Sequence, residues 1–444
     1  MSSAIAASHL HIDIERLHDH KIIIATASGQ SGFGDTVCAI KVATLIHERL
    51  GIPVANIILN IASFDESIAR FNEKYNFPHH PDISALRDID IACYIIAPLN
   101  NTEKFCELKK KISKASPLLS LSEYNWGDPL PRLPASHEGF EAFKAARMGI
   151  IVSGEPTDKA DERGILISEE LKEWGLREDS TSSINRIFQL KKISPDLTRV
   201  ILETETPEDA ILMEFDASNR LYYGYSCYIS TALSYVAAIS KIDQMKDPIK
   251  NPTLILPIKI ISFTDQVGKE TYLGLLKYLR EQNYGNLIVK STANKILESV
   301  KFSESPKTIT LIIGPISYSD SLTLWKCSED ETITTGDQSL SEAISCIRKR
   351  YGYEALLHKT ALSIGLSQAY IKFSAEPAPT FGFGAFESPF PEMADRLASL
   401  YSDPSKALAF TNFNRSIIEE QDCSNFIVDE VSKMLSSHFT ESIK

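Results

Sequence analysis

Three glycines and an aspartate follow the first strongly apolar run of the chain. Gly29, Gly32 and Gly34 separate the run 22–26 from a stretch whose apolar residues recur at helical spacing. Glycine allows positive φ angles and a close approach of a ligand to the backbone. The free N–H groups of a helix start attract anions. Asp35 adds a carboxylate at this helix start, where it serves either as an N-cap or as a general base.

A second segment, 331–345, repeats the order of strand, glycine turn and helix. Gly336 permits the turn, and Asp337, Gln338 and Ser339 open the following helix. Its free N–H groups suit a diphosphate, because a helix N-terminus stabilises negative charge. A well-capped helix without a ligand is the alternative reading.

Two common nucleotide-binding patterns do not fit the first turn. The phosphate-binding loop G-x-x-x-x-G-K-[ST] requires a lysine where this chain has Asp35, and a carboxylate there would repel a triphosphate. The dinucleotide pattern G-x-G-x-x-G is reordered here, and no acidic residue ends the next strand, 57–60. We therefore expect neither a P-loop nor a dinucleotide site.

The motif Gly32-Phe33-Gly34-Asp35 resembles the N-terminal turn of bacterial heptosyltransferases and protein-arginine rhamnosyltransferases, which are GT-B glycosyltransferases. This resemblance implies an α/β fold of two Rossmann-like domains, whose parallel sheets face a central cleft. It also implies that Asp35 is the catalytic base and that the three residues before it contact the bound ligand.

The second turn resembles the nucleotide-sugar motif of the same transferases. The resemblance implies that the nucleotide part of the donor contacts Gly336, Asp337, Gln338 and Ser339. Tyr225 and Gly314, each near a strand end, are further candidate donor contacts, although tyrosines of 222–225 also suit a core. Those transferases often have Gly-Lys/Arg-Pro after this helix. In this chain a different sequence, 346–352, stands in its place, so the shape of the donor pocket stays open.

Glu123 is the second candidate catalytic residue, because it ends the apolar strand 117–125 on the edge where Asp35 is expected. A structural hydrogen bond is the alternative role. No metal is expected. The D-x-D at 88–90 precedes its strand, whereas ligands collect at the carboxyl ends of strands. The histidines of the first 20 residues lack helical ligand spacing.

Composition sets limits on the class of protein. The chain has 444 residues, 43% of them hydrophobic and 23% charged, which is typical of a globular protein. A net charge of −12 argues against nucleic-acid binding. The seven cysteines form no C-x-x-C pair. Scattered cysteines such as Cys38 and Cys93 suggest buried thiols in a cytoplasmic protein. No apolar run is long enough for a membrane span, and an uncleaved secretion signal is not excluded.

The alternation of strands and helices predicts two domains and a final helix. We expect an acceptor-side domain over 1–208, with a charged, proline-containing boundary at its end. A nucleotide-sugar domain follows over 209–414. The last segment, 415–444, is expected to be a helix that packs back on the first domain.

These features predict an inverting glycosyltransferase. It moves a sugar from a nucleotide-diphosphate sugar to a protein, glycan or small-molecule acceptor, without a metal or other cofactor. Two alternatives stay open. One is a non-catalytic nucleotide-sugar-binding or interaction protein on the same scaffold, and the other is a sugar-nucleotide hydrolase or epimerase.

Overall fold

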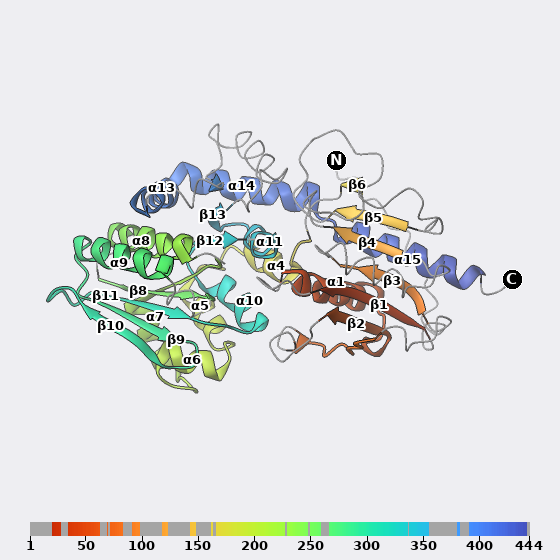
Figure 1. Ribbon diagram of the computed structural model, residues 1–444, viewed down its shortest axis with the longest axis horizontal. Coiled ribbons are helices and arrows are strands. Elements are labelled where there is room, and N and C mark those ends of the chain that lie inside the picture. Colours follow the sequence, from red (N-terminus) through yellow and green to blue (C-terminus); the bar gives the residue numbers. More distant parts are fainter. Residues whose placement is uncertain are drawn as a thin grey trace. The chain divides into compact units, whose positions relative to one another are not determined.

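The computed structural model divides the chain into two compact units (Figure 1). Unit 1 contains residues 1–166 and 422–444, and unit 2 contains residues 167–421. The structure describes residues 20–27, 34–62, 69, 72–82, 91–97, 118–122, 143–147, 161–162, 166–226, 229–246, 249–258, 266–335, 337–354, 380–381 and 390–441.

Unit 1 is built on one parallel six-stranded sheet of order β2-β1-β3-β4-β5-β6. The strands are β1 (Lys21–Ala27), β2 (Ile57–Ala62), β3 (Ile91–Ile96), β4 (Leu118–Ser122), β5 (Phe143–Arg147) and β6 (Asp161–Glu162). β1 and β3 read as continuous apolar runs, because strands of a covered parallel sheet are buried on both faces.

Two long helices pack on this sheet. α1 (Gly34–Leu50) follows β1 and buries Val42, Ala43 and Ile46 against it. α15 (Ser424–Glu441), from the end of the chain, packs on β3 and α1, where Ile427 and Val431 are fully buried. A short 3-10 turn, η2 (Val54–Asn56), leads into β2.

Unit 2 has a five-stranded sheet of order β10-β9-β11-β8-β7. All its pairs are parallel except that of β10 with β9. A parallel three-stranded sheet, β12-β13-β14, continues beside β7. The strands are β7 (Asn219–Tyr223), β8 (Asn251–Leu256), β9 (Asn286–Ser291), β10 (Ile296–Lys301), β11 (Thr308–Ile313), β12 (Glu331–Thr335), β13 (Arg350–Glu354) and β14 (Thr380–Phe381).

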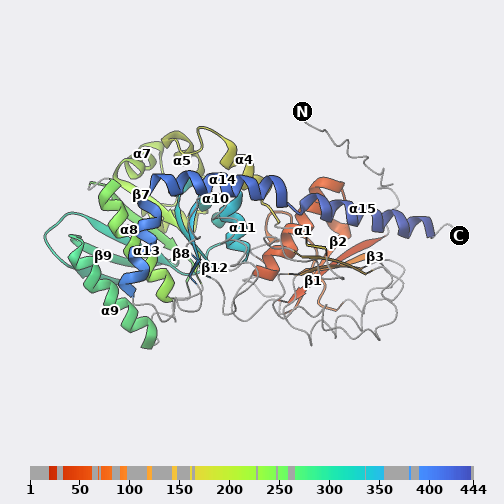
Figure 2. The same cartoon turned by 90° about the horizontal axis from the view of Figure 1, so that it is seen from above.

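Helices cover both sides of these strands. Figure 2 shows α5 and α7 on one side of β7 and β8, with α9 and α13 on the other. α8 is almost entirely buried between β8, α9 and α13. The helices of the unit are α4 (Glu169–Leu176), α5 (Ser183–Leu190), α6 (Pro195–Leu202), α7 (Asp209–Ser218), α8 (Ile229–Lys246), α9 (Gln266–Glu281), α10 (Tyr318–Cys327), α11 (Asp337–Ser345), α13 (Phe390–Ser402) and α14 (Pro404–Gln421).

The α/β class with mostly parallel sheets is confirmed by these strand pairings. The division of the chain differs from the expected boundary at 208, because α4 packs on α10 and α11, and α5 packs on α10, all within unit 2. The expected single helix over 415–444 is two helices, since α14 ends in unit 2 and α15 packs in unit 1.

Candidate functional site

β1 ends at the point where the strand order of unit 1 reverses. β1 lies between β2 and β3, so the chain moves from β1 to one side and later returns to the other. In open α/β sheets, ligands bind outside the carboxyl ends of the strands at such a switch point. The carboxyl end of β1 therefore lies at the expected ligand-binding edge of the sheet.

The first turn of α1 begins immediately after that segment. Gly34 opens the helix and is half-buried, and Asp35 is its second residue. The backbone position places residue 35 at the positive end of the helix dipole. Thr36 is fully buried, and its Oγ1 has no hydrogen-bond partner among the described residues. Burial of a hydroxyl without a hydrogen bond destabilises the folded state by about 1–3 kcal/mol. The hydroxyl of Thr36 is therefore a candidate contact for a bound ligand.

Three of the predicted site residues lie outside the described residues of unit 1. Gly32 and Phe33 belong to the turn itself, and Glu123 is the residue directly after β4. The side chain of Asp35 is also outside the description. Their assigned roles remain predictions.

Unit 2 has a second switch point, between β7 and β12. Backbone N–H groups of Tyr225 and Glu329 donate to the carbonyls of Ile333 and Leu221, over 2.9 and 2.8 Å, so β12 runs parallel beside β7. A Cβ on Gly224 would lie 2.7 Å from Cγ2 of Ile333, which shows how closely the two strands approach. Half-buried Tyr225 and the turn after β12 consequently share one edge.

The helix start after β12 carries one buried polar atom that has no hydrogen-bond partner in the described part of the chain. α11 begins at Asp337, whose side chain, like all of Gly336, lies outside the description. Gln338 is half-buried, and its buried Oε1 has no hydrogen-bond partner among the described residues. Ser339 is buried. Thr334, at the end of β12, is fully buried, and its Oγ1 also lacks a partner within the described part of the chain.

The structure gives Gly314 a conformational role. It follows β11 with a φ of 125°, a conformation that side chains other than glycine rarely adopt. A Cβ there would lie 2.5 Å from Oγ1 of Thr292. β8 separates β11 from β7, so Gly314 is not a neighbour of the turn after β12. Its expected contact with a donor remains a prediction.

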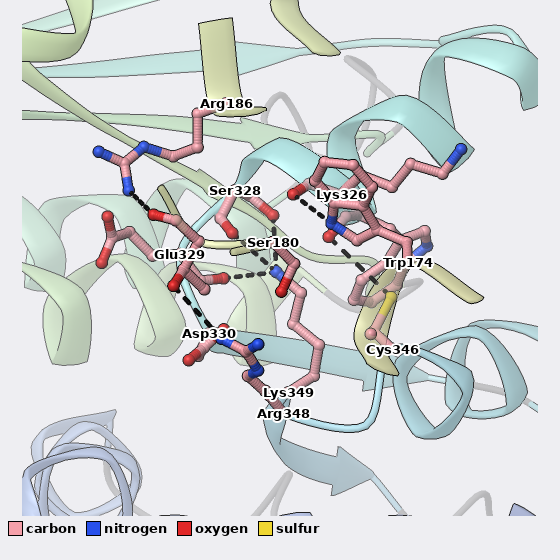
Figure 3. Close-up of a pocket in the computed structure, with 13 residues that line it drawn as sticks. Trp174, Ser180, Arg186, Lys326, Ser328, Glu329, Asp330, Cys346, Arg348 and Lys349 are labelled. Carbon is pink, nitrogen blue, oxygen red and sulfur yellow. Dashed lines mark hydrogen bonds between the residues drawn. The ribbon is translucent and has the colours of Figure 1, made fainter. Parts of the chain in front are cut away.

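A cavity of about 200 Å³ lies elsewhere in unit 2 (Figure 3). It is formed where the chain enters β12 and β13, by Ser328, Glu329 and Asp330 on one side and by Arg348 and Lys349 on the other. This is the amino end of the strands, opposite the edge that carries the turn at 336. The cavity is therefore distinct from the predicted donor site.

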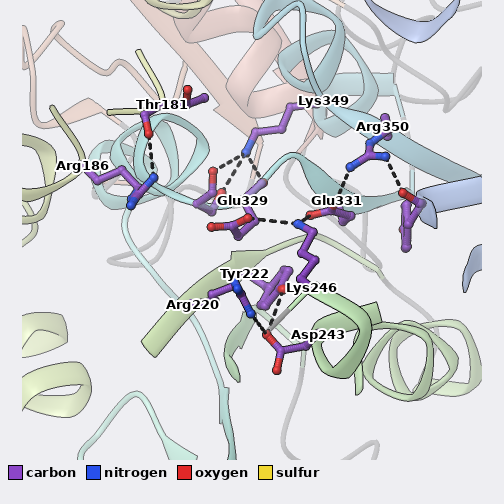
Figure 4. A network of polar contacts seen from close by, with 12 residues as sticks. Thr181, Arg186, Arg220, Tyr222, Asp243, Lys246, Glu329, Glu331, Lys349 and Arg350 are labelled. Carbon is purple, nitrogen blue, oxygen red and sulfur yellow. Dashed lines mark hydrogen bonds and ion pairs between the residues drawn. The ribbon is translucent and has the colours of Figure 1, made fainter. Parts of the chain in front are cut away.

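Buried ion pairs hold the strands of the second switch point in place (Figure 4). Asp243 of α8 is fully buried and forms ion pairs with Arg220 at 2.9 Å and with Lys307 at 2.8 Å. Glu331, the first residue of β12, is also fully buried, and it pairs with Lys246 at 2.7 Å and with Arg350 of β13. These pairs join β7, β12 and β13 to one helix.

The described cysteines, histidines and carboxylates give no sign of a reactive thiol or a metal site. Burial raises the pKa values of Cys93 and Cys346 to about 12, so these thiols stay protonated. The described residues contain no group of three or more histidines, cysteines or carboxylates placed to hold a metal ion. Within the described residues, no helix is long and apolar enough to span a membrane.

Signals for the unpaired hydroxyls were weak in the sequence. Thr36 and Thr334 stand next to the two glycine turns, but threonine is an ordinary residue both at helix starts and in strands. Only the burial and the hydrogen-bond pattern single them out. The charged residues that pair in unit 2 come from distant segments, so no spacing rule could have joined them.

No family model matches the chain, and no curated protein matches it by sequence. Among solved structures, it is similar to the α,α-trehalose-6-phosphate synthase of Burkholderia multivorans, with 9% identity and a TM-score of 0.44 over 96% of this chain and 100% of that chain. It is also similar to Anabaena HepE in complex with UDP, with 11% identity and a TM-score of 0.44 over 94% and 100%. A glycosyltransferase from Rickettsia africae gives 11% identity and a TM-score of 0.38 over 95% and 99%. At such identities and TM-scores, the likeness assigns no activity to this chain.

Proposed function

We propose that this protein is a glycosyltransferase that uses a nucleotide-diphosphate sugar as donor and a protein, glycan or small molecule as acceptor. The observation that carries the proposal is the position of β1 and β12, the strands that precede the two glycine segments. Each strand lies at a switch point of its unit and is followed in the chain by a helix start, which is where α/β sheets bind ligands. Thr36 and Thr334, beside these segments in the chain, each have a buried hydroxyl without a partner among the described residues.

In this proposal, unit 2 binds the donor. The N–H groups at the start of α11 hold the diphosphate, and Thr334 and Gln338 offer polar atoms that the described residues leave unpaired. The same N–H groups stabilise the negative charge that develops on the leaving diphosphate. This arrangement needs no metal ion to assist departure. Tyr225, from the neighbouring strand end, is proposed to stack on the base or the sugar.

Asp35 serves as the general base. The acceptor oxygen or nitrogen attacks the anomeric carbon, its proton passes to the carboxylate, and the bond to the diphosphate oxygen breaks, which inverts the configuration at that carbon. An ordinary aspartate has a pKa of about 3.9, so partial burial that raises the pKa would strengthen Asp35 as a base. Glu123 is proposed to orient the acceptor.

The decisive variant is Asp35→Asn, assayed for transfer and for donor binding in parallel. Loss of a general base lowers turnover by about 10²- to 10⁴-fold, while donor affinity is expected to stay near that of the wild type. Asp429→Asn, at an exposed position of α15, is the matched control and should retain full activity. Undiminished turnover in the Asp35 variant would remove this residue from the mechanism. Consumption of donor without acceptor would instead indicate a sugar-nucleotide hydrolase.

A further inference from the structure

The cavity at the amino ends of β12 and β13 has an excess of positive charge. Three of its charged lining residues are already neutralised by groups that do not line it. These pairs are Arg186 with Asp216 at 2.7 Å, Glu329 with Lys246 at 3.0 Å, and Lys326 with Glu170. The charge that remains in the cavity comes from Arg348, Lys349 and Asp330.

Arg348 and Lys349 hydrogen-bond only neutral acceptors among the described residues. Lys349 is 3% exposed, and its ammonium group donates to the carbonyl and hydroxyl of Ser328, both at 3.0 Å, and to the carbonyl of Glu329 at 2.6 Å. Figure 3 shows the ammonium group of Lys349 among the residues that line the cavity. Arg348 donates to the carbonyl of Arg177 at 2.6 Å and to the hydroxyl of Thr181 at 3.3 Å. These contacts position both cations without cancelling their charge.

Asp330 is the one lining carboxylate left to oppose these two cations. Burial raises its pKa above the ordinary value, while nearby Lys349 acts in the opposite direction. A fully ionised Asp330 leaves one positive charge in excess, and a protonated Asp330 leaves two. In either state the cavity attracts an anion, although the whole chain carries a net charge of −12.

The backbone that presents the two cations is strained. Ile347, which precedes them, has a φ of 61°, and a β-branched residue rarely adopts this left-handed conformation. Gly175 supports the turn from the other wall, because a Cβ there would lie 2.7 Å from the carbonyl oxygen of Cys346. Strain of this kind costs about 1–3 kcal/mol and persists at sites where the chain must hold a particular geometry.

We propose that this cavity binds a compact phosphate dianion, either inorganic phosphate or the phosphate of a small monoester. The guanidinium of Arg348 and the nearby hydroxyls of Ser180, Thr181 and Ser328 can donate to a phosphate, while Lys349, whose three N–H groups already donate within the protein, supplies positive charge. A phosphate carries about −1.5 to −2 charges at neutral pH, which balances the uncancelled cations. The volume of about 200 Å³ admits such a group but falls below the ~300–1,000 Å³ of sites for drug-sized ligands.

This site is separate from the proposed donor site and does not depend on it. The turn at 336 follows the carboxyl end of β12, and the cavity precedes its amino end. Five strand residues at about 3.3 Å each separate the two by roughly 15 Å. Binding at the two places can therefore be distinguished by variants of Arg348 and of Ser339.

The test is calorimetric titration of the full chain with inorganic phosphate, glycerol 3-phosphate and malonate, at constant ionic strength set with chloride. We expect saturable binding of phosphate, with glycerol 3-phosphate showing whether a monoester binds better and malonate binding more weakly. Arg348→Gln should weaken phosphate binding about 10- to 100-fold, the effect of losing one charge-assisted contact. Arg280→Gln, at an exposed position of α9, is the matched control and should bind as the wild type does.

Asp330→Asn gives a test of opposite sign, because removal of the opposing carboxylate should tighten phosphate binding. This variant keeps the proposal testable if Arg348→Gln fails to fold, which its thermal unfolding without phosphate would reveal. The proposal is overturned if the wild type shows no saturable heat with phosphate or prefers malonate. It is also overturned if Arg348→Gln binds normally, if Asp330→Asn does not bind more tightly, or if Ser339→Ala alone removes the binding.

Discussion

Replacement of Thr334 by valine should stabilise the protein and weaken donor binding at the same time. The side chain is fully buried, and its Oγ1 has no hydrogen-bond partner among the described residues. Valine has nearly the same shape and removes the unsatisfied hydroxyl, so we expect the free energy of unfolding to rise by about 1–2 kcal/mol. If the hydroxyl contacts the donor, its loss removes a hydrogen bond of about 0.5–1.5 kcal/mol, which weakens donor affinity about 3- to 10-fold.

Thr332 provides a matched control on the same strand. It is also fully buried, and residues two positions apart project from the same face of a strand. Its Oγ1, in contrast, donates to the carbonyl of Tyr223 over 2.6 Å. Thr332→Val should therefore lower the free energy of unfolding by about 1–2 kcal/mol, through the loss of that hydrogen bond.

Urea unfolding of the two variants and the wild type, followed by calorimetric titration of the donor, measures both effects. The reasoning predicts stability changes of opposite sign for the same chemical replacement. Equal destabilisation by both variants would show that the hydroxyl of Thr334 is satisfied in the folded protein. A more stable Thr334→Val that binds donor normally would separate this residue from the donor site.

Three further predictions concern the scaffold of unit 2. Glu331→Gln should destabilise the protein by about 1.5–3 kcal/mol in urea unfolding, because it removes the fully buried carboxylate that pairs with Lys246 and Arg350, whereas exposed Glu304→Gln should have almost no effect. Gly314→Ala should cost about 1–3 kcal/mol in the same assay, since its φ is 125° and the new Cβ would crowd Thr292; an unchanged stability would contradict this. Burial would raise the pKa of Asp216, but hydrogen bonds from its arginine and serine partners bring the pKa below the ordinary value. Its stabilising effect is therefore complete at neutral pH and is lost as pH falls through the lowered pKa. Asp216→Asn should cost about 1–2 kcal/mol in urea unfolding at pH 7, and this cost should shrink as the pH of the assay is lowered below the ordinary carboxyl pKa.

The sequence predicted the α/β class because buried parallel strands and amphipathic helices have clear periodicities. Ile22 to Ile24 form a fully buried stretch of β1, and α1 and α11 begin directly after the predicted glycine turns. Strand order could not be predicted, since the position of β12 beside β7 depends on contacts between segments more than 100 residues apart. The expected boundary near 208 misjudged α4 and α5, because a charged, proline-containing loop marks a surface connection and not necessarily the end of a domain.

The site residues stay predictions, but the strands and helices that flank them could be predicted. Glycines next to polar helix starts have a local signal, and the structure places the preceding strands, β1 and β12, at switch points. The cavity at the amino ends of β12 and β13 had no such signal in the sequence, because Trp174, Asp330 and Arg348 come from separate segments. In the sequence, the segment 346–352 differed from the motif that this region resembles, but nothing indicated that its Arg348 and Lys349 line a cavity at the amino ends of β12 and β13.

The central claim is that the turn after β12 binds the diphosphate of a nucleotide-sugar. Its most direct test is calorimetric titration with a panel of nucleotide-diphosphate sugars, performed on the wild type and on Gln338→Glu. One donor should bind the wild type saturably, and an added carboxylate in the first turn of α11 should weaken that donor about 10-fold or more by repulsion. Gln266→Glu, at the start of α9, should leave its affinity unchanged. Absence of binding by every donor, or equal binding by the wild type and Gln338→Glu, would contradict the proposed function.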